Sequence, residues 1–159
     1  MNSEIIFYRE SNWRGRYGDS NRKDISIRAD FSNPAEWPYT LKKVHTRYER
    51  GTGSVPVSSE TLKLSRDLFL KIRGVIADAK YELASCEEDI ENGSMDGAGE
   101  AYTFTIDGFS KLIRGDEIYG TGSWEAEKYE ENRRTENFVV YSVVKKIEDL
   151  LASANICLW

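Results

Sequence analysis

Residues 60–84, with the sequence ETLKLSRDLFLKIRGVIADAKYELA, decide the fold because they carry the clearest periodicity of the chain. Apolar residues recur there every three to four positions, which is the stripe of an amphipathic helix. The stripe consists of Leu62, Phe69, Ile72, Ile76, Ala79 and Leu83. Ser58 or Ser59 is a suitable N-cap, since a serine side chain accepts a hydrogen bond from the first helical turn. We predict that the helix begins at one of these two serines.

The chain on both sides of this helix shows the two-residue alternation of strands. Before the helix we predict strands at 3–10, 25–31 and 40–50, with a loop at 11–24 and with GTGSVPV (51–57) ending the third strand. After the helix, Tyr102, Phe104 and Ile106 alternate with polar residues, a turn follows at Gly108, and the next strand is either 109–115 or 117–122. A second helix is predicted at 136–154 from its inward-facing residues Val140, Val143, Val144, Ile147, Leu150 and Leu151.

The order of these elements, β-β-β-α-β-β-α, predicts an α+β fold: a mostly antiparallel sheet with two main helices packed on one face. A chain of 159 residues suits a single domain, 1–159, that buries about 70% of the surface its unfolded form exposes. It contains no apolar run of about twenty residues and no signal segment, so we expect a soluble, cytoplasmic protein with no membrane partner. Cys86 and Cys157 lack metal-ligand spacing, and we expect both to be reduced thiols.

Charge is distributed unevenly along the chain. Residues 1–80 carry a net charge of +5 and residues 81–159 a net charge of −10, which gives the total of −5. No Pro-, Ser- or Gly-rich linker separates the two halves. We therefore expect one domain with an electrically polarised surface.

The segment CEEDIENGSMDGAGE (86–100) holds six carboxylates and no Lys or Arg. Its last twelve residues begin with Asp and end with Glu, as a calcium-binding EF-hand loop does, and Asp89, Glu91 and Glu100 match three of the ligand positions. However, Gly93 replaces the fifth-position ligand and Ser94 replaces the glycine that the turn requires. We expect no metal here, and the segment is either a solvated loop or an interaction surface.

Motifs for catalysis or phosphate binding are absent. GTGS occurs at 51–54 and 120–123, each after a predicted strand and ahead of a predicted helix, but neither copy opens directly into a helix as a phosphate-binding loop does. We interpret both as flexible strand exits or as remnants of a duplication, with anion binding as the lesser alternative. His45 is the single histidine, and no Ser or Cys stands in a nucleophile motif. Carboxylate pairs alone can perform acid–base chemistry, so an enzyme stays a third alternative. Our prediction is that the protein is not an enzyme and takes no cofactor.

Binding of a protein is the function that the residues favour. Acidic and aromatic residues are interleaved in two segments, and together they form the candidate protein-binding site: Glu87, Glu88, Asp89, Glu91, Asp96, Glu100, Trp124, Glu125, Glu127, Tyr129, Glu130 and Glu131. Rings supply buried anchors at an interface, while carboxylates steer a basic partner. We predict a protein-binding inhibitor, an immunity protein or antitoxin that neutralises a basic toxin such as a nuclease. Its oligomeric state is left open.

A nucleic-acid-binding module is the alternative. The N-terminal segment interleaves basic and aromatic residues, a combination that holds single-stranded nucleic acid: Tyr8, Arg9, Trp13, Arg14, Arg16, Tyr17, Arg22 and Lys23. Glu10, Asp19 and Asp24 dilute its charge, and the negative total repels polyanions. Nucleic acid is therefore not the expected partner, and packing of these rings on the sheet is the simpler interpretation.

Overall fold

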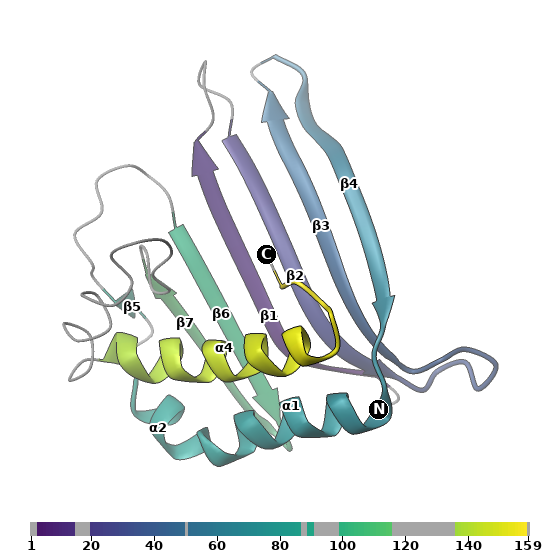
Figure 1. The fold of residues 1–159 in the computed structure, drawn as a ribbon. Coiled ribbons are helices and arrows are strands. Elements are labelled where there is room, and N and C mark those ends of the chain that lie inside the picture. The colour runs from purple at the N-terminus through teal and green to yellow at the C-terminus, as the bar shows by residue number, and fades with distance from the viewer. Residues whose placement is uncertain are drawn as a thin grey trace.

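The computed structural model describes residues 3–14, 20–49, 51–86, 89–90, 99–115 and 136–158, which form one sheet with helices on one face (Figure 1). The strands are β1 (Ser3–Arg14), β2 (Ser20–Asp30), β3 (Tyr39–Glu49), β4 (Gly53–Lys63), β5 (Asp89–Ile90), β6 (Gly99–Ile106) and β7 (Phe109–Gly115). The helices are α1 (Arg66–Asp78), α2 (Lys80–Ser85) and α4 (Glu136–Ser153). The strand order is β4-β3-β2-β1-β6-β7-β5. Six strands pair antiparallel, and the short β5 joins β7 in parallel.

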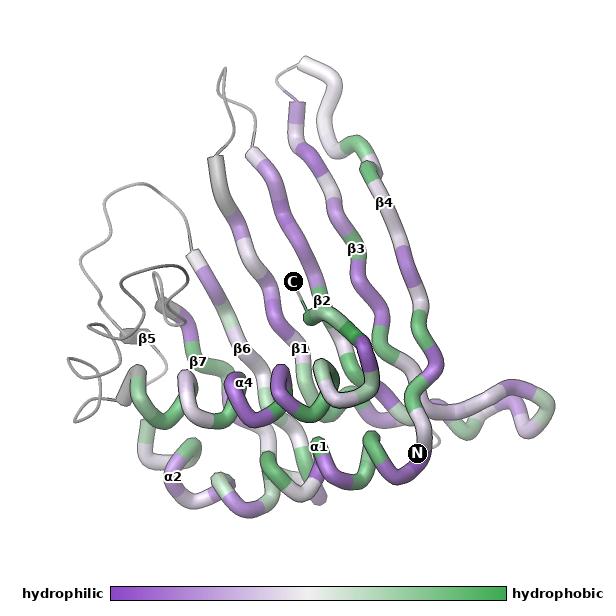
Figure 2. The backbone as a smooth tube through the Cα atoms, in the orientation of Figure 1, coloured by the Kyte–Doolittle hydropathy of each residue, from purple (hydrophilic) through white to green (hydrophobic). Residues whose placement is uncertain are grey.

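The hydrophobic core lies between the sheet and the helices. Alternate residues of the central strands point toward α1 and α4 and are at most 1% exposed: Phe7, Ile25, Ile27, Leu41, Tyr102, Phe104 and Ile113. The helices contribute Ile72, Ile76, Val140, Val144, Ile147 and Leu151, each with no exposed surface. Burying one such side chain contributes about 1.5–3 kcal/mol. Figure 2 shows that β2 and β3 become largely hydrophilic where they extend beyond α4.

Helix α1 begins later than the sequence predicts. Ser65, not Ser58 or Ser59, is its N-cap, and the Ser65 hydroxyl oxygen accepts a hydrogen bond from the backbone N–H of Leu68 at 3.1 Å. Leu62 belongs to β4 and pairs with Leu41 of β3. The apolar pattern before Ser65 fits either period, and pairing with β3 selects the strand.

A break at Ala79 divides the predicted helix into α1 and α2. Ala79 has φ −95° and ψ 3°, and its N–H still donates to the carbonyl oxygen of Val75. The apolar stripe continues through the break, since Leu83 in α2 is fully buried. The two helices therefore cover the core as the predicted single helix would.

The largest correction is β4, which the sequence interpretation missed. The first GTGS is a hairpin turn, with φ of 90° at Gly51 and 85° at Gly53, and a strand follows it instead of a helix. Pro56 lies within β4, and the pairing with β3 shifts register beside it, which leaves Val57 as a bulge. Most β4 side chains are exposed, so no apolar alternation marks the strand.

The β1–β2 hairpin is also longer than predicted. Strand β1 continues to Arg14 and β2 starts at Ser20, so most of the predicted loop 11–24 is paired strand, with Arg14 opposite Ser20. This extension lies beyond the helices (Figure 1), and its described side chains, at 11–12 and 20–24, are polar and at least partly exposed. A strand without a buried face shows no two-residue period.

The second half of the described chain agrees with the prediction. Asp107 (φ 43°) and Gly108 (φ 79°) form the two-residue turn between β6 and β7, and both φ values suit the turns that connect twisted strands. Helix α4 matches the predicted helix to within one residue. The α+β class and the antiparallel sheet are confirmed, whereas the predicted order lacked β4, β5 and the separate α2.

Candidate protein-binding site

The structure describes few of the predicted binding residues. Glu100 is the one with a described side chain, and Asp89 is placed by its backbone in β5. The remaining candidates lie outside the described residues: Glu87, Glu88, Glu91, Asp96, Trp124, Glu125, Glu127, Tyr129, Glu130 and Glu131. Most of the candidate EF-hand loop and the second GTGS lie outside them too. The candidate site is therefore located by the strands and helices next to the two acidic segments.

Glu100 lies in a nearly buried ion pair with Arg9. The Arg9 Nη2 atom donates to Glu100 Oε1 at 2.5 Å, and the hydroxyl of Tyr102 donates to Glu100 Oε2 at 3.1 Å. The side chains of Arg9 and Glu100 are only 8% and 15% exposed. The Arg9 guanidinium also lies 5.7 Å from the centre of the Tyr102 ring, within cation–π range. Glu100 thus fixes the start of β6 to β1, and its charge is compensated inside the fold.

The described ends of both acidic segments meet at Gly115. In the sheet, Gly115 pairs with Glu100 of β6 on one side and with Ile90 of β5 on the other. Residues 91–98 connect those two partners, and residues 116–135 follow Gly115 directly. Figure 1 shows β5, β7 and the first turn of α4 on the same side of the molecule. We call segments 87–100 and 116–135 together the acidic edge.

Helix α2 adds described residues next to this edge. It contacts both β7 and α4 and leads directly into residue 87. Its Tyr81 side chain is 84% exposed, the largest fraction among the exposed large hydrophobic residues of the described chain, and its neighbour Glu82 is exposed too. The sequence offered no signal for Tyr81, because it lies on the polar side of the predicted helix.

The arginines of the rival basic segment whose side chains the structure describes, Arg9 and Arg22, are compensated within the sheet. Arg9 is buried against Glu100, and the Arg22 guanidinium donates to Asp24 at 3.0 Å and to the Tyr8 hydroxyl at 3.1 Å. These hydrogen bonds, together with the charges of Asp24 and Glu10, raise the pKa of Arg22. Burial, followed by the hydrogen bond to Asp24, raises the pKa of Tyr8 above 10. The side chains of Trp13 and Arg14, and residues Arg16 and Tyr17, lie outside what the structure describes.

Groups suited to catalysis are not brought together in the described chain. His45 Nε2 lies 3.1 Å from the side-chain oxygen of Asn21 on β2. Among the described residues, no group of three His, Cys, Asp or Glu side chains is placed to hold a metal ion. Cys86 is buried and Cys157 is exposed. No helix in the described ranges is long and apolar enough to cross a membrane.

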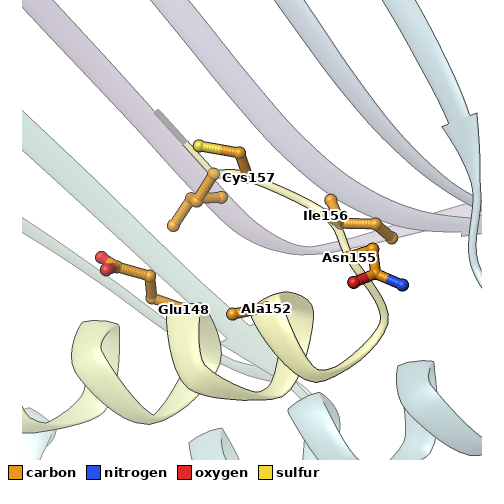
Figure 3. A pocket seen from close by; sticks show the side chains of 6 residues that line it. Glu148, Ala152, Asn155, Ile156 and Cys157 are labelled. Atoms are coloured by element: carbon orange, nitrogen blue, oxygen red, sulfur yellow. The ribbon is translucent and has the colours of Figure 1, made fainter.

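A shallow hollow of about 360 Å³ separates α4 from the C-terminal tail (Figure 3). It is lined by Glu148, Ala152, Asn155, Ile156, Cys157 and Leu158. The lining is largely apolar and offers one carboxylate and one thiol. Lys43 holds the tail above the sheet by donating to the carbonyl oxygen of Cys157. The hollow forms where the C-terminal tail turns back onto the protein, because Leu158 of the tail is buried and only 1% exposed.

The acidic edge is therefore the candidate site that the geometry supports best. The chain matches no protein-family model and no curated protein.

Proposed function

We propose that the protein is a small cytoplasmic inhibitor that binds a basic protein through its acidic edge. Immunity proteins and antitoxins that neutralise nucleases act in this way, without a catalytic group of their own. The supporting observation is the pairing of Gly115 with both Glu100 and Ile90, because it brings the described ends of the two acidic segments to one sheet edge. The proposal includes the predicted packing of the two main helices on one face of the sheet.

Charge makes this edge suitable for a basic partner. The acidic edge contains twelve carboxylates and three basic residues, whereas the whole chain has a net charge of only −5. The rest of the chain is consequently net positive. A concentrated negative field raises the rate at which a basic protein is captured, and the effect falls as salt rises.

Anchoring requires buried rings in addition to steering charges. Trp124 and Tyr129 lie within the second acidic segment, and Tyr81 stands exposed on the adjacent α2. Tyrosine and tryptophan dominate the residues whose loss costs an interface most, typically 2 kcal/mol or more. We propose that these rings hold the partner after the carboxylates have steered it.

The test is to isolate the partner from the native host and to measure its binding kinetics by surface plasmon resonance. The captured protein should be basic, and its association should slow with salt. Reversing Glu127, Glu130 and Glu131 to Lys should slow association, whereas Trp124→Ala should speed dissociation. A control reverses two carboxylates outside the acidic edge, Glu36 between β2 and β3 and Glu60 in β4. The proposal fails if the partner is not basic, or if binding survives both changes unaltered.

A further inference from the structure

The face of the sheet opposite the helices, which we call the open face, carries a second charged surface. Figure 1 shows α1 and α4 on the same side of the sheet, and no described element covers the other side. Cross-strand pairing places one row of residues across this face: Thr61, Lys42, Ser26, Tyr8, Thr103 and Leu112. These residues alternate with the buried positions of their strands, so their side chains point away from the core.

Three basic residues lie together on the open face and form what we call the basic strip: Arg28, Lys42 and Lys63. Arg28 pairs with Thr40, and Thr40 pairs with Lys63, so Arg28 and Lys63 stand in one row across β2, β3 and β4. Lys42 lies two residues from Thr40 on β3. Strands about 4.8 Å apart, with about 3.4 Å between residues, place Lys42 roughly 8 Å from both neighbours.

The basic strip lacks compensating ion pairs within the described chain. No described carboxylate lies within 4.0 Å of the charged nitrogens of its three residues. The acids in the middle of the open face, Glu10 and Asp24, pair with Arg22 instead. Hydrogen bonds from Ser32 and, more weakly, the charge of Arg28 lower the pKa of Asp30, so Arg28 is partly compensated. Arg28 is half-buried, with a buried Nε atom, whereas Lys42 and Lys63 are exposed and turn their positive charge to solvent.

The composition of the open face fits a phosphate polymer better than a protein or a membrane. Stable protein interfaces have an apolar core, and membrane surfaces require inserted apolar side chains. The open face also holds the acids Glu10 and Asp24 and five separate apolar or aromatic side chains, and its other residues are mainly Ser, Thr, Lys and Arg: the five are Ile5, Tyr8, Val44, Tyr48 and Leu112. Interfaces with nucleic acid are polar, wet and positively charged. The rings of Tyr8 and Tyr48 provide surfaces on which unpaired bases can stack.

The negative total charge does not prevent such binding. Apart from Glu100 in β6, whose charge Arg9 compensates, the acidic edge begins at β7 and β5, whereas the basic strip is centred on β3, and β3 and β7 are four strand steps apart. Four steps of about 4.8 Å make roughly 19 Å, which exceeds the Debye length of about 8 Å at physiological salt. Fields of opposite sign can therefore act separately on the two sides of the molecule.

We propose that the open face binds single-stranded nucleic acid, with phosphates at the basic strip and bases stacked on Tyr8 and on Tyr48, which lies roughly 20 Å from Lys42 along β3. The basic strip shares no residue with the N-terminal segment, whose described arginines are already paired, although Tyr8 belongs to both that segment and the open face. The proposal is also independent of the inhibitor function, because the two surfaces share no residue.

The test is fluorescence anisotropy of a fluorescein-labelled fifteen-nucleotide oligouridylate titrated with the full chain. Three phosphate contacts on a single strand predict a slope of log affinity against log salt of about −2, so binding should weaken roughly tenfold between about 50 and 150 mM salt. The double variant Lys42→Ala, Lys63→Ala should reduce the slope to about −0.7 and weaken binding at the lower salt at least tenfold.

The matched control is Lys71→Ala, Lys145→Ala, which removes the same charge from α1 and α4 on the covered side. Circular dichroism and melting should show both double variants to be folded as the wild type is. Retained binding in the control supports the proposal. Absence of binding at up to about 10⁻⁴ M protein, or equal loss in both double variants, would overturn it. Reversing Glu127, Glu130 and Glu131 of the acidic edge to Lys should leave oligonucleotide binding at least as strong as in the wild type. The failure of one proposal therefore does not entail the failure of the other.

Discussion

Breaking the buried pair between Arg9 and Glu100 should be among the most destabilising single changes in the described chain. We consider Arg9→Met, which keeps the length and the packing of the side chain but removes its charge. Glu100 would remain 15% exposed without its cation. At an effective dielectric of about 20, two unit charges about 4 Å apart attract by about 4 kcal/mol. Removing one partner of a buried pair typically costs 3–5 kcal/mol, and we expect a loss in that range.

Equilibrium unfolding in urea measures this loss directly. With a slope of about 2 kcal/mol per molar urea, a loss of about 4 kcal/mol moves the midpoint down by about 2 M. Glu100→Gln should cost somewhat less, because the amide oxygen still accepts from Tyr102. The double variant Arg9→Met, Glu100→Gln should recover much of the stability, since it buries no unpaired charge.

The double-mutant cycle decides whether the pair acts as a unit. A coupling energy above about 2 kcal/mol supports the buried geometry. If Arg9→Met costs less than about 1 kcal/mol and the two losses simply add, the pair behaves like a surface salt bridge and the reasoning is refuted. Arg47→Met is the matched control, because the pair of Arg47 with Glu49 is much more exposed, at 43% and 32%.

Three further predictions concern stability and calcium. Ser65→Ala should lower the free energy of unfolding by about 1 kcal/mol through loss of the α1 cap, whereas Ser58→Ala, at the N-cap that the sequence suggested, should change it by less than about 0.5 kcal/mol; urea unfolding compares them. The raised pKa of Tyr8 means that the folded state favours its neutral phenol, so this contribution to stability is complete below pH 10 and is lost as pH rises through the folded pKa. Tyr8→Phe should therefore flatten the alkaline decline of the melting temperature, and an unchanged decline would contradict the assignment. Millimolar calcium should not raise the melting temperature by several degrees, because the 89–100 segment lacks a central ligand and the turn glycine; scanning calorimetry with and without calcium checks this.

The part of the fold that could be predicted from sequence is the part with one buried face. Strand β6 alternates Tyr102, Phe104 and Ile106 toward the core, and α4 repeats its apolar residues at helical spacing, so both were located within two residues. The helical stripe of α1 was recognised for the same reason. Where an element buries only one of its faces, the spacing of its apolar residues indicates whether it is a helix or a strand.

The rest could not be predicted because its side chains meet solvent on both faces. Strand β4 and the outer halves of β1 and β2 carry polar residues without a period, and their pairing with neighbouring strands defines them. For the candidate site, the sequence predicted the concentration of negative charge but not the contacts of its side chains. That Glu100 would be neutralised by Arg9 depends on pairing between residues ninety-one positions apart, which no local pattern reveals. The exposed Tyr81 and the basic strip likewise required the three-dimensional arrangement.

The proline and the bulge in β4 have a consequence for the behaviour of the protein at high concentration. Strand β4 is the last strand on its side of the sheet, and an edge strand with regular unpaired N–H and C=O groups can recruit another chain into the same sheet. Pro56 removes one N–H donor, and the bulge at Val57 twists the strand away from a flat template. Both features should make the sideways addition of another chain to β4 less favourable.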